Sequence, residues 1–145
     1  MNSPKSQLHS KEINFFEDLI FEYGDLIFRF MLAITLNKET STFLTKTVFQ
    51  NLSEQINKLQ NLNKDTLIIF LLKEAYITYS NSEYKKTVIN QDLNLNILSA
   101  LNTDNRIIFF LSDIIGFTHE AIQTIVSKTI EDIIKLLKEA RTIIC

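Results

Sequence analysis

Few side chains in this sequence are spaced for catalysis or for metal binding. The two histidines, His9 and His119, are far apart, and a zinc site needs about four ligands at set spacing. Cys145 has no evident base beside it, and the adjacent acids at 17–18 and 131–132 suit helix surfaces better than an acid/base pair. The sequence also lacks a glycine-rich loop that would hold a phosphate. We therefore expect a protein that is not an enzyme and that binds no cofactor.

The sequence also has too few Lys and Arg residues for strong nucleic-acid binding to be expected. The formal net charge is −2, and acids slightly outnumber Lys and Arg in both halves of the chain. Neutralising several phosphates takes several positioned cations, and a phosphate-binding surface normally shows a basic surplus. Composition alone therefore does not predict a strong nucleic-acid binder.

The composition favours an all-α fold. The chain has 145 residues, of which 46% are hydrophobic, enough for one compact domain or two small helical lobes. Its only glycines and proline are Gly24, Gly116 and Pro4. Folds that turn often through hairpins use more of both residues, so their scarcity indicates long helices rather than sheets.

The sequence also gives expectations about location. The first ten residues are polar, unlike the apolar centre of a signal peptide. The longest apolar run, residues 67–72, is far shorter than the roughly 18 residues that a membrane span requires. The single cysteine, Cys145, excludes an internal disulfide and fits a reducing compartment. We expect a soluble, cytoplasmic protein with no membrane partner.

The spacing of apolar residues predicts where the helices lie, because steps of three and four place side chains on one helical face. The predicted helices cover residues 13–36, 40–59, 64–79, a stretch starting near 92, 104–115, 118–126 and 129–143. Gly116 is placed to end one of them in a left-handed cap. Thr118 and Thr129 are placed to cap the starts of the last two, which together resemble a helix-turn-helix unit.

A polar stretch, residues 80–91, interrupts this periodicity and predicts a linker between two helical lobes. The predicted lobes are residues 12–79 and 92–145, after a flexible N-terminus over residues 1–11. Lobes of this size are marginally stable alone, so we expect them to contact each other.

Two stretches resemble a known family. Residues 16–30 (FEDLIFEYGDLIFRF) and 44–49 (LTKTVF) are similar to the opening helices of sigma region 2. Residues 98–101 and 111–122, together with Arg106 and Arg141, are similar to sigma region 4. The order of these matches resembles bacterial RNA polymerase sigma factors of the extracytoplasmic-function group.

The resemblance implies a polymerase or partner contact on the second helix. The matching positions are Phe43, Leu44, Lys46 and Thr47. The family usually carries acidic and glutamine side chains on this face, and here Phe43, Lys46 and Thr47 replace them. The loss of an acid and the gain of a lysine should weaken the electrostatic docking that the resemblance implies.

The resemblance also implies two DNA contacts. The positions facing a −10 promoter element would be Phe70, Lys73, Tyr76 and Tyr79, and those facing a −35 element would be Lys135, Lys138 and Arg141. Capture of single strands needs a positive groove and exposed rings, whereas residues 67–74 are so apolar that core packing is the favoured interpretation. On the last helix Glu131, Asp132 and Glu139 would repel phosphates, which favours a solvated amphipathic helix.

Three hypotheses about function follow. The first is a diverged sigma factor that binds RNA polymerase core and directs initiation at promoters. The second is a sigma mimic that does not bind DNA and instead occupies an anti-sigma factor or another protein partner. The third is an interaction protein that forms a homodimer. The eleven phenylalanines exceed what two small lobes would bury, and an exposed apolar patch would mark a protein partner.

Overall fold

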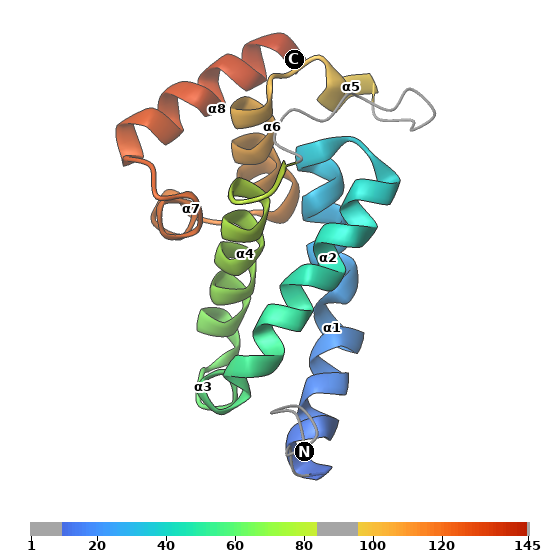
Figure 1. Ribbon diagram of the computed structural model, residues 1–145. Coiled ribbons are helices and arrows are strands. Elements are labelled where there is room, and N and C mark those ends of the chain that lie inside the picture. The colour runs from blue at the N-terminus through green and yellow to red at the C-terminus, as the bar shows by residue number, and fades with distance from the viewer. Residues whose placement is uncertain (1–9, 84–95, 145) are drawn as a thin grey trace.

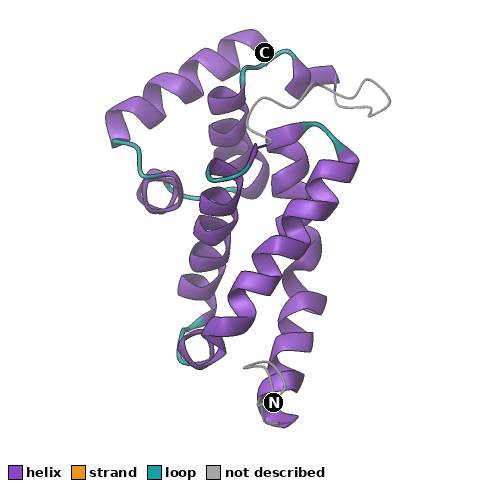
Figure 2. Ribbon diagram, viewed as in Figure 1, coloured by secondary structure: helices purple, strands orange, loops and turns teal. Residues whose placement is uncertain are grey.

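The computed structural model describes residues 10–83 and 96–144, and every regular element in these residues is a helix or helical turn (Figures 1 and 2). The all-α prediction is therefore confirmed. Of the N-terminus predicted to be flexible, residues 1–11, residues 1–9 lie outside the described residues, whereas Ser10 and Lys11 belong to the first helix. Most of the predicted linker, residues 84–91, also lies outside them. The elements are α1 (Ser10–Thr35), α2 (Lys38–Leu52), the 3₁₀ turn η2 (Ser53–Gln55), α3 (Ile56–Gln60), α4 (Lys64–Ser80), α5 (Asn96–Ser99), α6 (Thr103–Phe109), the π-helical turn η4 (Phe110–Ile115), α7 (His119–Val126) and α8 (Ile130–Ile144).

The predicted caps around the last two helices are confirmed. Gly116 adopts a left-handed conformation, with φ 95°, where η4 ends, a backbone region that glycine enters without steric cost. The Thr118 hydroxyl accepts a hydrogen bond from the Ala121 backbone N–H at 3.1 Å, and the Thr129 hydroxyl accepts one from Asp132 at 3.1 Å. Each threonine thus satisfies a backbone donor that the first turn of its helix leaves unpaired.

The boundaries predicted for the second helix were wrong at both ends. It begins at Lys38 rather than at Thr40, because the Asn37 side chain caps it by accepting the Thr40 N–H at 2.8 Å. It ends at Leu52 rather than continuing to Leu59. The Ser53 hydroxyl donates to the Gln50 carbonyl oxygen at 2.6 Å where the 3₁₀ turn begins, a local bond of the kind that competes with regular helix.

The helix predicted over residues 104–115 also differs. Its regular α-helical part, α6, starts at Thr103 and stops at Phe109, and the chain then continues as the wider π-helical turn η4. The Gly116 N–H accordingly bonds to the Leu111 carbonyl five residues earlier, at 3.2 Å. Ile108, Leu111 and Ile115 keep steps of three and four residues through the turn and all pack in or against the core, so apolar spacing alone does not reveal it.

One hydrophobic core joins the two predicted lobes. Helices α1, α2 and α4 run alongside one another, and α8 crosses the end of the molecule where α6 lies (Figure 1). Buried side chains such as Phe30 on α1 and Phe110 in η4 belong to the same apolar cluster, with ring centroids 6.0 Å apart. The contact that we expected between residues 12–79 and 92–145 is therefore present, whereas their division into two lobes stays a prediction.

Arg106 provides a polar connection between the same two parts. This α6 side chain is 5% exposed, and its guanidinium donates to the carbonyl oxygens of Ala33 (2.6 Å), Ile34 (2.5 Å) and Leu101 (2.7 Å). Ala33 and Ile34 lie in the last turn of α1, where backbone carbonyls lack helical partners and carry partial negative charge. Burial lowers the pKa of Arg106, but a guanidinium stays charged at neutral pH. Arg106 therefore caps α1 from the C-terminal half of the chain.

Candidate functional site

The predicted partner-contact residues on α2 divide between surface and core. Phe43 is 54% exposed, and Lys46 is also exposed. Thr47 is half-buried and its hydroxyl donates to the Phe43 carbonyl oxygen at 3.0 Å. Leu44 is only 1% exposed and belongs to the core. Three of the four residues thus reach the surface, and Leu44 does not.

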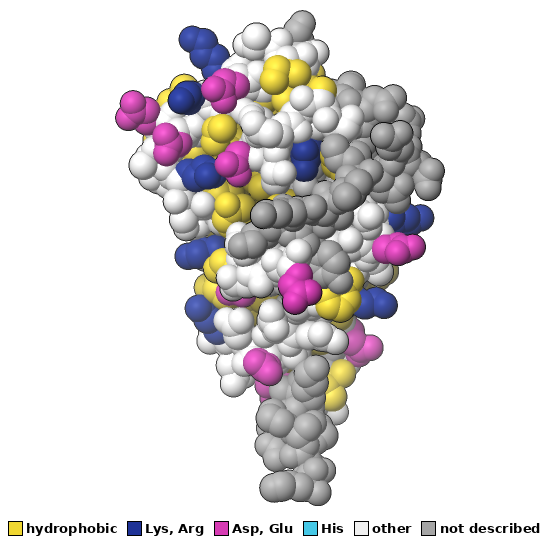
Figure 3. All heavy atoms as spheres, turned by 45° about the horizontal axis from the view of Figure 1, so that its top comes forward, with side chains coloured by type: hydrophobic (Ala, Val, Ile, Leu, Met, Phe, Trp, Pro, Cys, Tyr) yellow, Lys and Arg dark blue, Asp and Glu magenta, His cyan; other side chains and the backbone are white. Residues whose placement is uncertain are grey.

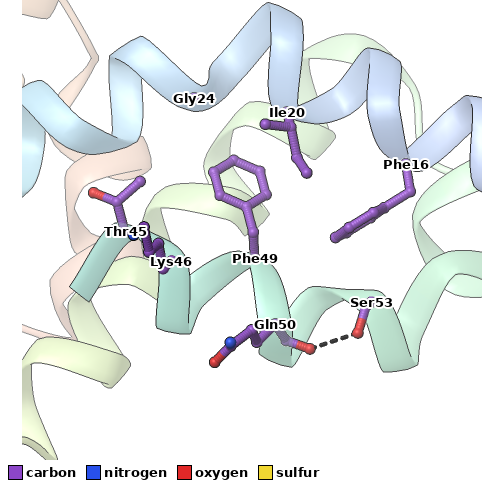
Figure 4. Close-up of a pocket in the computed structure, with 8 residues that line it drawn as sticks. All are labelled: Phe16, Ile20, Gly24, Thr45, Lys46, Phe49, Gln50 and Ser53. Carbon is purple, nitrogen blue, oxygen red and sulfur yellow. Dashed lines mark hydrogen bonds between the residues drawn. The ribbon is translucent and has the colours of Figure 1, made fainter. Parts of the chain in front are cut away.

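An apolar groove lies between α1 and α2 beside these residues. The rings of Phe16 and Phe49 and the side chain of Ile20 converge between the two helices (Figure 4). The two rings meet edge to face with centroids 6.4 Å apart, a favourable aromatic geometry. The groove has a volume of about 500 Å³, and it is lined by Phe16, Ile20, Gly24, Thr45, Lys46, Phe49, Gln50 and Ser53. We refer to these eight residues as the α1–α2 groove.

The two walls of the groove differ in polarity. The α1 wall is apolar, with Phe16, Ile20 and the backbone at Gly24. The α2 wall adds a cation, Lys46, and polar side chains to Phe49. Phe21, which follows Ile20 on α1, is 91% exposed but does not line the groove. Exposed large apolar side chains on the helices that form an apolar groove are typical of a protein-binding surface.

The residues predicted to face a −10 element do not form a stacking surface. Tyr79 is 8% exposed, and burial raises the pKa of its hydroxyl. Phe70 and Tyr76 are half-buried, as is Lys73. The Lys58 ammonium lies 4.6 Å from the centroid of the Phe70 ring, which places a cation on the ring face that a base would otherwise stack on.

The residues predicted to face a −35 element are all exposed on α8. Lys138 and Arg141 line one pocket with His119, whereas Lys135 does not. The Arg141 guanidinium binds both carboxylate oxygens of Asp113, at 2.9 and 2.7 Å. This cation is therefore already paired within the protein by the two-pronged geometry that arginine prefers with carboxylates.

Acids further limit the positive charge on α8. Glu131, Asp132 and Glu139 are exposed on the same helix as Lys135 and Lys138. Figure 3 shows cationic and acidic side chains interspersed over the upper part of the visible face, toward which α8 is turned. Mixed charges of this kind do not make the continuous basic surface that a phosphate backbone requires.

The Asp113–Arg141 pair makes stability depend on acid pH. Hydrogen bonds from Arg141 hold the pKa of Asp113 below its ordinary value, although partial burial acts in the opposite direction. The lowered pKa means that the pair contributes stability above the unfolded pKa of roughly 4 and loses it as pH falls through the folded pKa. Asp113→Asn should lower the free energy of unfolding by about 0.5 kcal/mol at pH 7, because the pair remains partly in contact with solvent, with 52% of the Arg141 side chain and 24% of the Asp113 side chain exposed. In urea titrations the difference from wild type should shrink as pH falls below roughly 4, and a gap of unchanged size at the lowest pH at which both proteins fold would contradict the assignment.

The described residues offer no metal site or membrane span. Within residues 10–83 and 96–144, no group of three or more His, Cys, Asp or Glu side chains is placed to hold a metal ion. No helix among them is long and apolar enough to cross a membrane. The chain matches no protein-family model, no curated protein and no solved structure.

Sequence reasoning found part of this site and missed the rest. Lys46 on the α2 wall was identified through the family resemblance, together with its exposed neighbour Phe43. Phe16, Ile20 and Gly24 fall in the stretch that resembles sigma region 2, but none of them was predicted to form a contact surface. Ile20 and Phe21 are adjacent on α1 and exceed what one buried face accommodates, a signal that points to a second, solvent-facing apolar surface.

Proposed function

We propose that this protein is a helical protein-binding module, a sigma mimic that engages a protein partner and does not read DNA. The observation that carries the proposal is the apolar surface on the α1–α2 hairpin, where Phe21 is 91% and Phe43 54% exposed. The same two helices line the apolar α1–α2 groove, and exposed apolar surface of this kind commonly marks a protein-binding site. The family resemblance gives the partner class, either an anti-sigma factor or another regulatory protein.

The charge distribution supports binding to protein rather than DNA. Arg141 is paired with Asp113, and three exposed acids accompany the two lysines of α8. On α4 the aromatic side chains are buried or half-buried. Base stacking and phosphate neutralisation, which together hold single strands, therefore have few side chains available.

A working sigma factor that binds RNA polymerase core is the second candidate. The observation that favours it is the pair α7 and α8, a short capped helix and a longer helix that displays Lys135 and Lys138 to solvent. In that case promoter DNA would contact α8, and polymerase would contact the α2 face at Phe43 and Lys46.

The test compares the full-length tagged protein with a Phe21→Ser/Phe43→Ser double variant. Captured proteins would be identified by mass spectrometry from the source cells, and duplex DNA binding would be measured by fluorescence anisotropy at 50 and 200 mM salt. We expect a protein partner that stays bound at both salt concentrations and is reduced at least tenfold by the double variant, with no tight DNA binding. Both substitutions are at exposed sites, so the thermal midpoint should change little.

A different set of results would support the second candidate, the working sigma factor. Recovery of the large polymerase subunits, together with DNA binding that weakens steeply with salt and is reduced by Lys135→Ala, would establish the sigma factor and overturn the mimic.

A further inference from the structure

Gly24 is the least expected residue in the α1–α2 groove. It lies in the middle of α1, where glycine is less favourable than any residue except proline because it gives up the most backbone freedom. Its backbone does not require glycine, since the positive-φ positions are elsewhere. A Cβ atom added there would meet only the Ile20 Cγ2 atom, at 3.8 Å, which is ordinary van der Waals contact. Internal packing therefore gives no reason for glycine at this position.

A close approach from outside would explain Gly24. The glycine forms part of the groove wall, opposite Thr45 and Lys46 on α2 (Figure 4). Without a side chain, α1 exposes its backbone at this point, and a second helix can come closer there than anywhere else along the wall. Small residues have this effect wherever helices pack at short distance.

The charge of the groove indicates which polar group its occupant should carry. Lys46 is the only charged residue that lines it, and among the described residues the salt bridges involve other lysines and Arg141. A carboxylate on the occupant would therefore find a cation at the end of the groove where Gly24 lies. The remaining surface, formed by Phe16, Ile20 and Phe49, calls for apolar side chains.

The dimensions match a short helical segment. Phe16 and Gly24 mark the two ends of the α1 wall, and eight residues of helix span about 12 Å, or roughly two turns. Phe21 is 91% exposed and does not line the groove, so a small ligand held in the groove would leave it uncovered.

We propose that the α1–α2 groove binds one amphipathic helix of a partner protein, with its apolar face on Phe16, Ile20 and Phe49, its backbone against Gly24 and a carboxylate beside Lys46. This inference rests on the proposed protein-binding function and assigns it a site and a partner chemistry. It belongs to the helix-in-groove mode of recognition, in which apolar anchors recur at every third or fourth residue of the bound helix.

The experiment uses photo-crosslinking from inside the groove. The full-length protein would carry p-benzoylphenylalanine in place of Gln50, an exposed residue of the α2 wall, and would be irradiated in its source cells. The crosslinked peptide would be sequenced by mass spectrometry. We expect it to come from a different protein and to have apolar residues at helical spacing with an Asp or Glu on one side.

Two variants then test the geometry. Gly24→Leu places a side chain in the groove and should reduce the crosslink at least tenfold while raising, not lowering, the thermal midpoint. The matched control Asn14→Leu adds the same side chain at an exposed α1 position outside the groove and should leave the crosslink within twofold of wild type. Lys46→Glu should reduce the crosslink severalfold, and a carboxylate-to-lysine change in the partner should restore it.

The outcomes separate this inference from the proposed function. A protein partner that is captured by the wild type but is insensitive to Gly24→Leu would overturn the groove assignment and leave the protein-binding function intact. Crosslinks to a second copy of the chain would identify a homodimer interface instead. Absence of any crosslinked protein, or crosslinks to the polymerase subunits through a non-helical segment, would also reject the amphipathic helix.

Discussion

Replacing Arg106 by methionine should lower the free energy of unfolding by about 3 kcal/mol. The substitution leaves the carbonyl oxygens of Ala33, Ile34 and Leu101 without the guanidinium that now binds them at 2.5–2.7 Å. Each buried acceptor left unpaired costs about 1–3 kcal/mol, and removal of a buried charge offsets part of that sum. In a chain of this size the loss corresponds to a fall in the thermal midpoint of roughly 10 °C.

Two controls make the Arg106 prediction specific. Lys135→Met makes a similar chemical change at an exposed position on α8 and should alter stability by less than about 0.5 kcal/mol. Arg106→Lys keeps the charge but replaces the planar fork by a single ammonium, so it should recover only part of the loss. Chemical denaturation measures all three variants. If Arg106→Met unfolds at the wild-type urea concentration, the hydrogen bonds between α6 and α1 contribute no net stability.

The parts of the fold that were predictable from sequence have local causes. Thr118 and Thr129 each bond to a backbone N–H three residues further on, and Gly116 ends η4 through its own backbone conformation. The apolar stripe of α1 is likewise a repeat of three and four residues. Signals of this kind need no knowledge of the rest of the chain.

The features that sequence reasoning missed depend on distant parts of the chain or on small differences in energy. Arg106 binds residues 72 and 73 positions earlier, a pairing that no spacing pattern indicates. Ile56 and Leu59 remain buried beyond the break at Ser53, so the apolar repeat continues through a change of helix type. The groove arises because the side chains of α1 and α2 do not fill the space between the two helices, which is a property of packing and not of either helix alone.

The acids of α8 give the second large prediction, an engineered gain of DNA binding. In the triple variant Glu131→Gln/Asp132→Asn/Glu139→Gln, the lysines at 135 and 138 would no longer have exposed acids on the same helix. Each phosphate neutralised by a cation releases counterions and steepens the salt dependence. We expect affinity for a duplex of about 20 base pairs to rise at least tenfold at 50 mM salt. Fluorescence anisotropy across a salt series should show the steeper slope.

The fold should tolerate this change. Glu131 and Asp132 lie in the first turn of α8, where acids favour the helix by about 0.3–1 kcal/mol each, but the Thr129 cap stays in place. Glu139 accepts a hydrogen bond from the Asn105 side-chain amide at 3.2 Å, and a glutamine oxygen can accept the same bond. A modest loss of stability should therefore accompany the gain in affinity, and circular dichroism would verify that the helices persist.

A matched variant separates the local effect from net charge. Glu17→Gln/Asp18→Asn/Asp25→Asn removes three exposed acids from α1 and gives the same net charge as the α8 variant. If α8 is positioned to lie against DNA, only the α8 variant should gain affinity, and Lys135→Ala should reverse it. An equal gain in DNA affinity in the α1 and α8 variants would mean that the affinity depends on net charge alone. If neither variant gains affinity, the resemblance to a promoter-reading helix ends at the order of the helices, because relieving the repulsion would have uncovered no surface that DNA can use.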